Sequence, residues 1–425
     1  MAEISPFKGI RYNKKSVDLN KVTCPPYDVI SPEEKQRYLN LDPYNFVRLI
    51  LGEDHNTDND VDNRFIRARS YLEDWLEKGV LVQDNEPSIY IYKQEFERGG
   101  RLCTVCGLTL AVKLHDYEDG VILPHENTLA KPKSHLVPLL STTRTNLDSV
   151  YGLYADEHGL LDDMMKSVMS SEPDEDVRDI DGVRHLLWVM SDPTEIRKVA
   201  DFIKDQPIAI ADGHHRYETA LAYSKESRKG SCCCAGKCEL ASDYVLMTIA
   251  NVYQKDMTIF PTHRVVDNLS DDFLTGLDNR LTELFDVEES TKSRLIDDMS
   301  SRGAIGIYRP GRAVTIKLKG NTGTLLEGSD ASRNLELNVL HKLVLERMLG
   351  IDKDKLRDQT HIVYTRDADE AIDMVDSGRK QMAFLLNNID VRAVLDIASA
   401  GEKMPQKATY FYPKLLSGLV LRKMD

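Results

Sequence analysis

The stretch 208–224, IAIADGHHRYETALAYS, contains the transition that decides the fold. Its first four residues form an apolar run that predicts a buried strand, and apolar side chains recur at helical spacing after Arg216. Asp212 and Gly213 then form a tight turn between strand and helix. Helices and strands alternate along the rest of the chain, with some antiparallel pairing, so we expect a mixed α/β or α+β fold.

The same turn gathers an acid, a glycine, two histidines and an arginine in five consecutive positions. The first turn of a helix has backbone N–H groups without intrahelical partners and the positive end of the helix dipole. His214, His215 and Arg216 add donors or positive charge there, which predicts a phosphate site made without a glycine-rich loop. Glu218 lies on the helix face of His214. The alternative is a helix capped by Asp212 with surface histidines.

Other segments predict further elements. Ser31 is expected to cap a helix, because Pro32 follows it and Glu34 completes a capping-box pattern. Residues 88–114 predict a hairpin around an Arg-Gly-Gly turn. The run NFVRLIL at 45–51 predicts a short apolar strand.

Length, charge and cysteine content limit the class of protein. With 425 residues, 41% of them apolar, the chain is too long for one ordinary core. Its net charge of −14 argues against nucleic acid as the main partner. No apolar run approaches the roughly 20 residues that cross a bilayer, and no signal core is visible at the start. The seven cysteines form no disulfide framework, so a cytoplasmic protein is expected.

Three regions are expected along the chain. Residues 1–160 would form a mixed α/β region with the PPYDVIS and HENTL loops. Residues 161–270 would form a core around the strand-to-helix turn, and residues 271–425 a C-terminal α/β region. These boundaries are not sharp in the sequence, and one compact unit is the alternative.

The loop CPPYDVIS, residues 24–31, is a second candidate site. Its two prolines stiffen the backbone and present Tyr27 and Asp28 to their surroundings. Asp28 is a candidate general base. The alternative is a turn in which Asp28 binds nearby backbone N–H groups.

A loop-rich stretch, LPHENTLAKPKSHLVPLL, places acid–base residues next to lysines. His125, Glu126, Lys131 and Lys133 would suit proton transfer and phosphate binding. An ordinary solvated loop with mixed charges is the alternative.

The C-terminal segment MPQKATYFYPKLLSGLV, residues 404–420, is aromatic and fixed by prolines, so we expect it to be packed. It would bring Lys407 or Lys414 into a pocket, or form a structural belt.

A metal site is another interpretation of the adjacent histidines. Zinc usually takes three or four protein ligands, so His125, Glu126 or His263 would have to join His214 and His215. The chain contains no HExxH motif and no zinc ribbon, and no metal ligand is assigned.

Six of the seven cysteines fall into two groups, and a metal site is not the leading interpretation of either. Cys103 and Cys106 stand in a strand pattern that points them to opposite faces. A dense group in a low-complexity insert is expected to form an oxidisable loop, with a zinc or iron–sulfur site as the alternative: Cys232, Cys233, Cys234 and Cys238.

Several motifs together resemble a large prokaryotic family of domains of unknown function, numbered ten-fifteen. They occur in the family's order over nearly the whole chain: PPYDVIS, NFVRLILG, WLEKGVL, YIYKQEF, HENTL, IADGHHRYETAL, FPTHRVV and GEKMPQKATYFYPKLLSGLV. The resemblance brings no established reaction, and the cysteine-rich insert departs from the family pattern.

The motif DGHHR is also similar to the phosphate-binding box of the ParB/sulfiredoxin superfamily, which includes partition proteins, sulfiredoxin and free serine kinases. The resemblance implies a ParB/sulfiredoxin-like core in which Gly213, His214, His215 and Arg216 hold nucleotide phosphates. The reactive cysteine of sulfiredoxin has no counterpart here, which argues against sulfinic-acid reduction.

The leading hypothesis is a nucleotide-dependent phosphotransferase that acts on a small hydroxylated, serine-like metabolite, with ATP or ADP and Mg²⁺ as cofactors. Phosphoryl transfer depends mainly on positioning and charge neutralisation. Asp212 would hold Mg²⁺ or orient His215. The expected catalytic residues are Asp28, Glu126, His215 and Glu218, and the expected nucleotide-binding residues are Asp212, Gly213, His214, His215, Arg216, Lys131 and Lys133.

Two alternatives remain open. A nucleotide-sensing protein would bind and change shape without turnover. A metal-dependent hydrolase would use His125, His214, His215 and His263. The sequence does not determine the oligomeric state.

Overall fold

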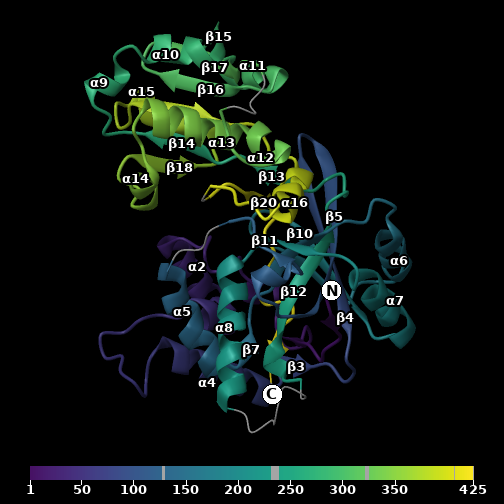
Figure 1. Ribbon diagram of the computed structural model, residues 1–425. Coiled ribbons are helices and arrows are strands. Elements are labelled where there is room, and N and C mark those ends of the chain that lie inside the picture. Colours follow the sequence, from purple (N-terminus) through teal and green to yellow (C-terminus); the bar gives the residue numbers. More distant parts are fainter. Residues whose placement is uncertain (127–129, 231–238, 321–324, 406, 425) are drawn as a thin grey trace. The chain divides into compact units, whose positions relative to one another are not determined.

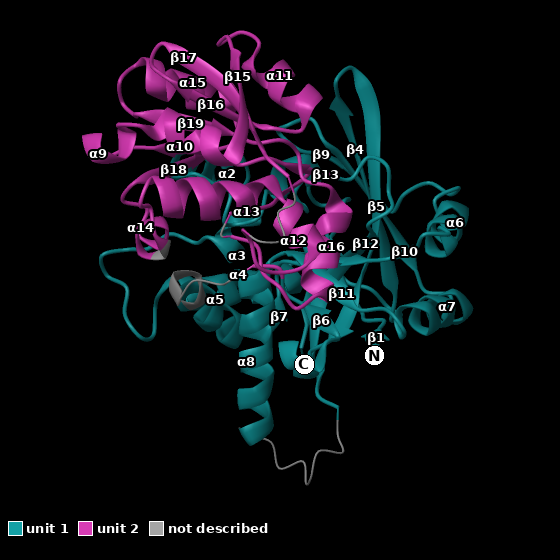
Figure 2. Ribbon diagram, turned by 45° about the horizontal axis from the view of Figure 1, so that its top comes forward, with its two compact units in different colours: residues 1–124, 128–257, 413–425 teal, residues 125–127, 258–412 magenta. Residues whose placement is uncertain are grey.

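The protein is described by a computed structural model that covers residues 1–126, 130–230, 239–320, 325–405 and 407–424, with the side chains of residues 130–133, 230 and 353 outside the description. The chain forms two compact units (Figure 2). Unit 1 consists of residues 1–124, 128–257 and 413–425, and unit 2 of residues 125–127 and 258–412.

Unit 1 is built on a nine-stranded sheet (Figure 1). The pairs β6–β11 and β8–β12 are parallel, and the other pairs are antiparallel. In spatial order the strands are β6 (Ile122–Leu123), β11 (Ile208–Asp212), β8 (Val150–Tyr154), β12 (Tyr244–Asn251), β5 (Arg101–Lys113), β4 (Ile89–Arg98), β10 (Arg184–Met190) and β9 (Glu175–Arg178), with β1 (Ile4–Ser5) beside β5. Two short pairs complete the unit, β2 (Ile10–Tyr12) with β3 (Leu81–Gln83) and β7 (Thr145–Asn146) with β21 (Arg422–Lys423).

The hairpin predicted at 88–114 is confirmed as β4 and β5. Its turn is formed by Gly99 and Gly100, both at positive φ, a conformation that glycine adopts without strain. Successive residues of β4 pack into two different cores, because side chains alternate between the two faces of a strand. Ile89 and Ile91 belong to one apolar cluster, whereas Tyr90 and Tyr92 belong to the other.

Helices cover both faces of this sheet. The core on the Tyr90 face includes residues of α1 to α4, and the core on the Ile89 face includes residues of α6, α7 and α8. The predicted capping box at Ser31 is confirmed at the start of α2. The helices of unit 1 are α1 (Leu19–Val22), α2 (Pro32–Leu41), α3 (Val47–Ile50), α4 (Arg64–Glu77), α5 (Ala130–Thr143), α6 (Leu160–Val168), α7 (Pro193–Ile203) and α8 (His214–Gly230), with short 3₁₀ turns η1 (Tyr117–Asp119) and η3 (Ala241–Asp243).

Two local predictions are wrong. The apolar run at 45–51 forms helix α3 and no strand, because the Asn45 side chain accepts the Val47 N–H and starts a helical turn. The stretch expected to be rich in loops contains the 14-residue helix α5. Leu136, Leu139 and Leu140 recur there at helical spacing and are buried.

Unit 2 contains an antiparallel sheet of six strands. Helices α11 and α15 pack against one face of this sheet and form an apolar core with it. In spatial order the strands are β15 (Phe285–Ser290), β17 (Arg312–Leu318), β16 (Ile305–Arg309), β19 (Met382–Leu385), β14 (His263–Val266) and β18 (Ile362–Thr365), and β13 (Thr258–Phe260) pairs separately with β20 (Tyr410–Tyr412). The helices are α9 (Asp271–Leu274), α10 (Leu277–Leu284), α11 (Leu295–Arg302), α12 (Asp330–Asn334), α13 (Glu336–Val339), the π-helix η5 (Leu340–Met348), α14 (Lys353–Arg357), α15 (Ala368–Asp376) and α16 (Val391–Ser399).

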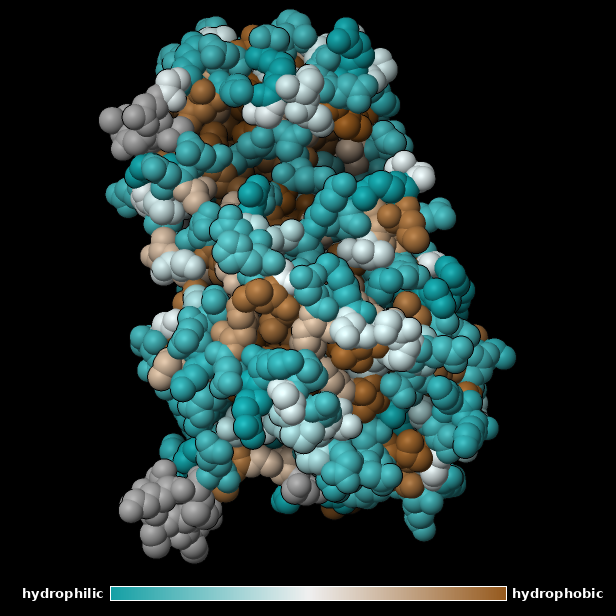
Figure 3. Space-filling model, turned by 90° about the vertical axis from the view of Figure 1, so that its right-hand side faces the viewer, coloured by the Kyte–Doolittle hydropathy of each residue, from teal (hydrophilic) through white to brown (hydrophobic). Residues whose placement is uncertain are grey.

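The mixed α/β class predicted from the sequence is confirmed by these sheets and helices. The face drawn in Figure 3 is mostly hydrophilic, with small apolar areas between polar side chains. Within the described ranges, no helix is both long and apolar enough to span a bilayer.

Candidate functional site

The strand-to-helix turn is formed as the sequence predicts, with β11 ending at Asp212 and α8 beginning at His214. Gly213 between them has a φ of +89°, which L-residues rarely adopt. A Cβ at this position would lie 2.9 Å from Nε of Arg216, closer than real Cβ contacts. The backbone conformation therefore favours glycine here, and a Cβ would in addition displace the guanidinium that folds back over the turn.

Arg216 is fixed by two acceptors. Its Nη2 donates to Oδ2 of Asp212 at 2.9 Å, and its Nη1 donates to the carbonyl oxygen of Ser149. The side chain is only 9% exposed. Ser149 directly precedes β8, which runs antiparallel to β11, so the start of β8 lies at the same sheet edge as the end of β11. Arg216 therefore ties the helix start to two neighbouring strands.

Lys414 reaches the same carboxylate from the C-terminal segment. Its Nζ lies 3.0 Å from Oδ1 of Asp212. The segment is held in unit 1 by backbone contacts, since Gln94 donates to the Lys414 carbonyl at 2.8 Å and the Leu416 N–H donates to the Tyr92 hydroxyl at 3.2 Å. The predicted packing of this segment is confirmed, and it brings Lys414 into the site.

Two further carboxylates, those of Asp28 and Asp148, interact electrostatically with Asp212 and Arg216. We use the name Asp212 cluster for Asp28, Asp148, Asp212, Arg216 and Lys414. Burial would raise the pKa of Asp212, but Lys414 and Arg216 outweigh it and hold that pKa at about 2. Asp212 is therefore ionised throughout the neutral range.

Asp28 behaves in the opposite way. Its side chain is exposed, yet the protein around it disfavours the charged form, and the Asp212 carboxylate adds repulsion. Both effects raise the pKa of Asp28, although Arg216 and Lys414 oppose them. Asp28 is thus the carboxylate of the cluster that is both reachable from solvent and closer to accepting a proton.

Asp148 precedes β8 together with Ser149. Burial raises its pKa, and Arg216 opposes the shift. Its Oδ1 is buried and makes no hydrogen bond within the described part of the chain. Sequence analysis missed Asp148 and Ser149, because only the pairing of β8 with β11 brings them to Asp212. The polar pair directly before an apolar strand is the signal that could have indicated them.

The remaining predicted residues of unit 1 surround the turn. His214 is buried and interacts electrostatically with Asp212, whereas His215 is half-buried. Glu218 lies one helical turn further and accepts a long 3.5 Å hydrogen bond from Tyr117. Lys131 and Lys133 fall in α5, and their side chains lie outside the described residues.

Other predicted residues belong to unit 2. His125 contacts the Thr409 hydroxyl through Nε2 at 2.9 Å, and Glu126 accepts the Ala408 N–H at 3.0 Å. His263 accepts the Leu386 N–H at Nδ1, and burial lowers its pKa to about 4. These three residues are held by contacts within unit 2, whereas the Asp212 cluster belongs to unit 1.

The described residues offer no ready group of metal ligands. No set of three or more His, Cys, Asp or Glu side chains among them is arranged to hold a metal ion. Cys103 and Cys106 lie in β5 as unpaired thiols. The predicted oxidisable loop with Cys232, Cys233, Cys234 and Cys238 lies outside the described residues.

Residues 4–341 match the family described as "Protein of unknown function (DUF1015)". The chain belongs to this family. The match confirms the family resemblance seen in the sequence motifs. No curated protein matches the chain.

Solved structures give only distant likenesses. A free serine kinase in complex with AMP is 13% identical with a TM-score of 0.35, over 72% of this chain and 86% of that chain. The protein SbnI with a C-terminal truncation, from Staphylococcus aureus, is 12% identical with a TM-score of 0.37, over 73% and 85%. A conserved hypothetical protein from Pyrococcus furiosus is 11% identical with a TM-score of 0.35, over 74% and 95%. The similarity of DGHHR to the ParB/sulfiredoxin box stays a prediction from sequence.

Proposed function

We propose that the Asp212 cluster is the site of a nucleotide-dependent phosphotransferase that acts on a small hydroxylated, serine-like metabolite. One observation carries the proposal. Two cations converge on Asp212 at the N-terminus of α8, while an exposed carboxylate with a raised pKa, Asp28, faces the same cations. This arrangement combines groups that attract phosphate with a candidate base.

Phosphoryl transfer needs charge neutralisation around the transferred group. Lys414 and Arg216 carry two positive charges, one of which Asp212 balances, and the N-terminus of the 17-residue helix α8 adds the positive end of its dipole. An ammonium has three N–H donors, so Lys414 can hold Asp212 and a phosphate oxygen together. Asp212 is engaged by a cation at each oxygen and acts as a positioning residue for both.

Asp28 is the proposed general base. A base works best when its pKa approaches the working pH, and the surroundings shift the pKa of Asp28 in that direction. In the proposed step, the substrate hydroxyl oxygen bonds to the terminal phosphorus of the nucleotide. The bond from that phosphorus to the bridging oxygen breaks, the shortened nucleotide leaves, and Asp28 takes the hydroxyl proton. With ATP the products are ADP and a phosphate monoester.

Mg²⁺ is commonly held by one or two carboxylates together with phosphate oxygens, so a complete protein cage is not required. Asp148 fits this role best, because its Oδ1 is buried without a hydrogen-bond partner in the described chain. When bound, Mg²⁺ would neutralise charge on the nucleotide phosphates. Asp212 fits less well, since Lys414 and Arg216 already occupy both of its oxygens.

The experiment measures nucleotide binding and transfer separately. Calorimetry with ATP, ADP, CTP and GTP in the presence of Mg²⁺ would compare the wild type with Lys414→Met. Lys423→Met is the matched control, because Lys423 is an exposed lysine of β21, shortly after the C-terminal segment. We expect Lys414→Met to weaken binding of one nucleotide about tenfold or more and the control to leave it unchanged. Absence of binding to every nucleotide would contradict the proposal.

Transfer is then tested with serine and other hydroxylated amino acids, by detection of the phosphate monoester. Binding without any transfer would favour the alternative of a nucleotide-sensing protein. A metal-dependent hydrolase has no specific support in the described residues, and bound zinc that is lost in the His214→Ala/His215→Ala variant would favour it.

A further inference from the structure

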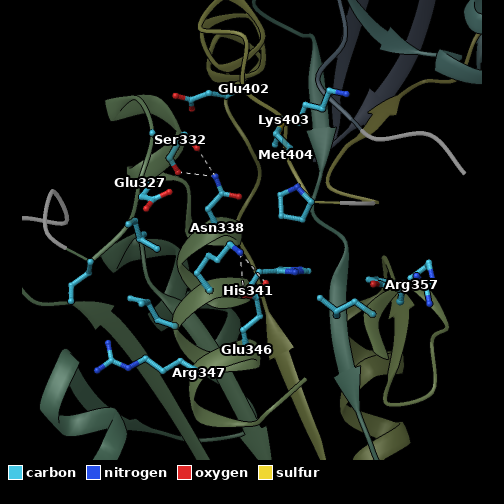
Figure 4. Close-up of a pocket in the computed structure, with 18 residues that line it drawn as sticks. Glu327, Ser332, Asn338, His341, Glu346, Arg347, Arg357, Glu402, Lys403 and Met404 are labelled. Carbon is cyan, nitrogen blue, oxygen red and sulfur yellow. Dashed lines mark hydrogen bonds and ion pairs between the residues drawn. The ribbon is translucent and has the colours of Figure 1, made fainter. Parts of the chain in front are cut away.

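Unit 2 contains a pocket of about 850 Å³ that its own residues line. This volume lies within the range of roughly 300–1,000 Å³ that is typical of small-molecule sites. Figure 4 shows one wall formed by the segment of α13 and η5, with Arg357 on the side away from Arg347. Glu402, Lys403 and Met404 border the pocket above the helix in that view.

The helical wall has an unusual geometry. Residues Leu340–Met348 form a π-helix, a rare conformation that is frequently found at functional sites. Four residues of this helix line the pocket, namely His341, Lys342, Glu346 and Arg347.

His341 is the polar group that points to a ligand. It is 4% exposed, and its Nε2 is buried without a hydrogen-bond partner in the described chain. Leaving a buried polar atom unpaired destabilises a protein, so such an atom at the wall of a pocket indicates a missing partner. Burial, together with the charge of Arg264, lowers the pKa of His341 well below its usual value. The imidazole is therefore neutral, with one N–H donor and one acceptor nitrogen, and a bound anion would favour the tautomer that carries the proton on Nε2.

A buried cation lies behind this end of the pocket. Arg264 is fully buried and forms no ion pair within the described ranges, although Glu126 interacts with it electrostatically. Its guanidinium donates to the carbonyls of Thr262 and Lys407 and lies 5.4 Å from the ring centre of Tyr364, which lines the pocket. Burial lowers its pKa only to about 10, so Arg264 stays charged at neutral pH. Its field favours a negative charge in the pocket.

The charged side chains that line the pocket also favour a negatively charged ligand. Two of the lining carboxylates are already engaged, since Glu346 pairs with Lys342 at 3.0 Å and Glu402 accepts hydrogen bonds from Ser329. The lining cations are Lys342, Arg347, Arg357 and Lys403, against the carboxylates Glu327, Glu346 and Glu402. Lys342 and Arg357 are themselves paired, with Glu346 and with Asp354 and Asp358, so Arg347 is the rim cation on which the attraction mainly depends.

We propose that this pocket binds a small organic anion, and that a carboxylate or phosphate oxygen of the ligand accepts a hydrogen bond from Nε2 of His341. The site lies entirely within unit 2 and does not depend on the function proposed for unit 1. Arg264 and the rim cations supply the electrostatic attraction, and the apolar part of the lining accommodates the carbon skeleton.

The test uses succinate, inorganic phosphate and the neutral analogue succinamide as probes on the full chain. The imidazole signal of His341 is followed by NMR and assigned by its loss in His341→Gln, with His361→Gln as the matched control. We expect succinate or phosphate to shift this signal in a saturable way and succinamide to leave it unchanged. His341→Gln should bind the active anion roughly tenfold more weakly.

Equal shifts from succinate and succinamide, or no shift from either anion, would overturn the proposal. Arg347→Gln, an exposed change on the rim, provides a second test if His341→Gln does not fold, and it should also weaken anion binding. Lys414→Met should leave the His341 response intact, so failure of the unit 1 proposal remains distinguishable from failure of this one.

Discussion

Lys414 and Arg216 hold opposite oxygens of one carboxylate. Lys414 Nζ lies 3.0 Å from Oδ1 of Asp212, and Arg216 Nη2 lies 2.9 Å from Oδ2. Arg216 is four residues from Asp212 along the chain, whereas Lys414 is 202 residues away. The contact with Arg216 fixes the turn between β11 and α8, and the contact with Lys414 joins the C-terminal segment to that turn. The Asp212 carboxylate is therefore a structural centre of unit 1 as well as part of its candidate site.

Asp212→Asn should destabilise unit 1. The substitution removes the charge that two largely buried cations share, and an uncompensated buried charge costs about 3 kcal/mol. Denaturant unfolding at pH 7 measures the loss. Asp163→Asn is the control, because Asp163 and its partner Lys166 are both highly exposed and solvent screens their ion pair. Equal effects of the two substitutions would show that the Asp212 contacts contribute little.

The contribution of Asp212 to stability should depend on acid pH. Its pKa is about 2 in the folded protein and near 3.9 in an unfolded chain, so folding favours the ionised form. This stability is fully present above about pH 4 and is lost as the pH falls toward 2. The difference in unfolding free energy between wild type and Asp212→Asn should therefore shrink over that window. A difference that stays constant from pH 6 to pH 2 would contradict the assigned shift.

The local part of the site could be predicted from sequence. The strand, the turn and the helix at 208–230 depend on neighbouring residues, and all three form as expected. The sequence could not decide between strand and helix for residues 45–51, because a short apolar stretch fits both. The hydrogen bond of the Asn45 side chain decides for the helix. Asp148 and Lys414 reach Asp212 through strand order and a long chain connection, which periodicity does not encode.

Gly213→Ala should weaken both stability and nucleotide binding. Alanine at a φ of +89° is strained by about 1–2 kcal/mol, and its Cβ would push the Arg216 guanidinium from its position. Gly182→Ala is a close control, since Gly182 has a φ of +82° with nothing within 4 Å of the added Cβ. Denaturant unfolding should show both variants to be less stable than the wild type by about the strain energy. Only Gly213→Ala should also reduce nucleotide affinity in calorimetry. Unchanged affinity in folded Gly213→Ala would separate the turn from the proposed phosphate site.

Asp28→Asn should greatly slow transfer while stabilising the fold at neutral pH. The surroundings raise the pKa of Asp28, so folding favours its protonated form, and the cost in stability grows as the pH rises from the ordinary pKa and is complete above the raised value. Asparagine resembles the protonated form and removes the repulsion from Asp212. Thermal unfolding at pH 7 should therefore show a higher midpoint for Asp28→Asn, and the gain should disappear at low pH, where the wild-type side chain is also neutral. Nucleotide binding should persist, because Lys414 and Arg216 remain, whereas formation of the phosphate monoester should fall about 100-fold or more through loss of the base. Unchanged transfer in Asp28→Asn would show that Asp28 is not the base. A lower midpoint at pH 7 would show that the Asp28 carboxylate stabilises the cluster.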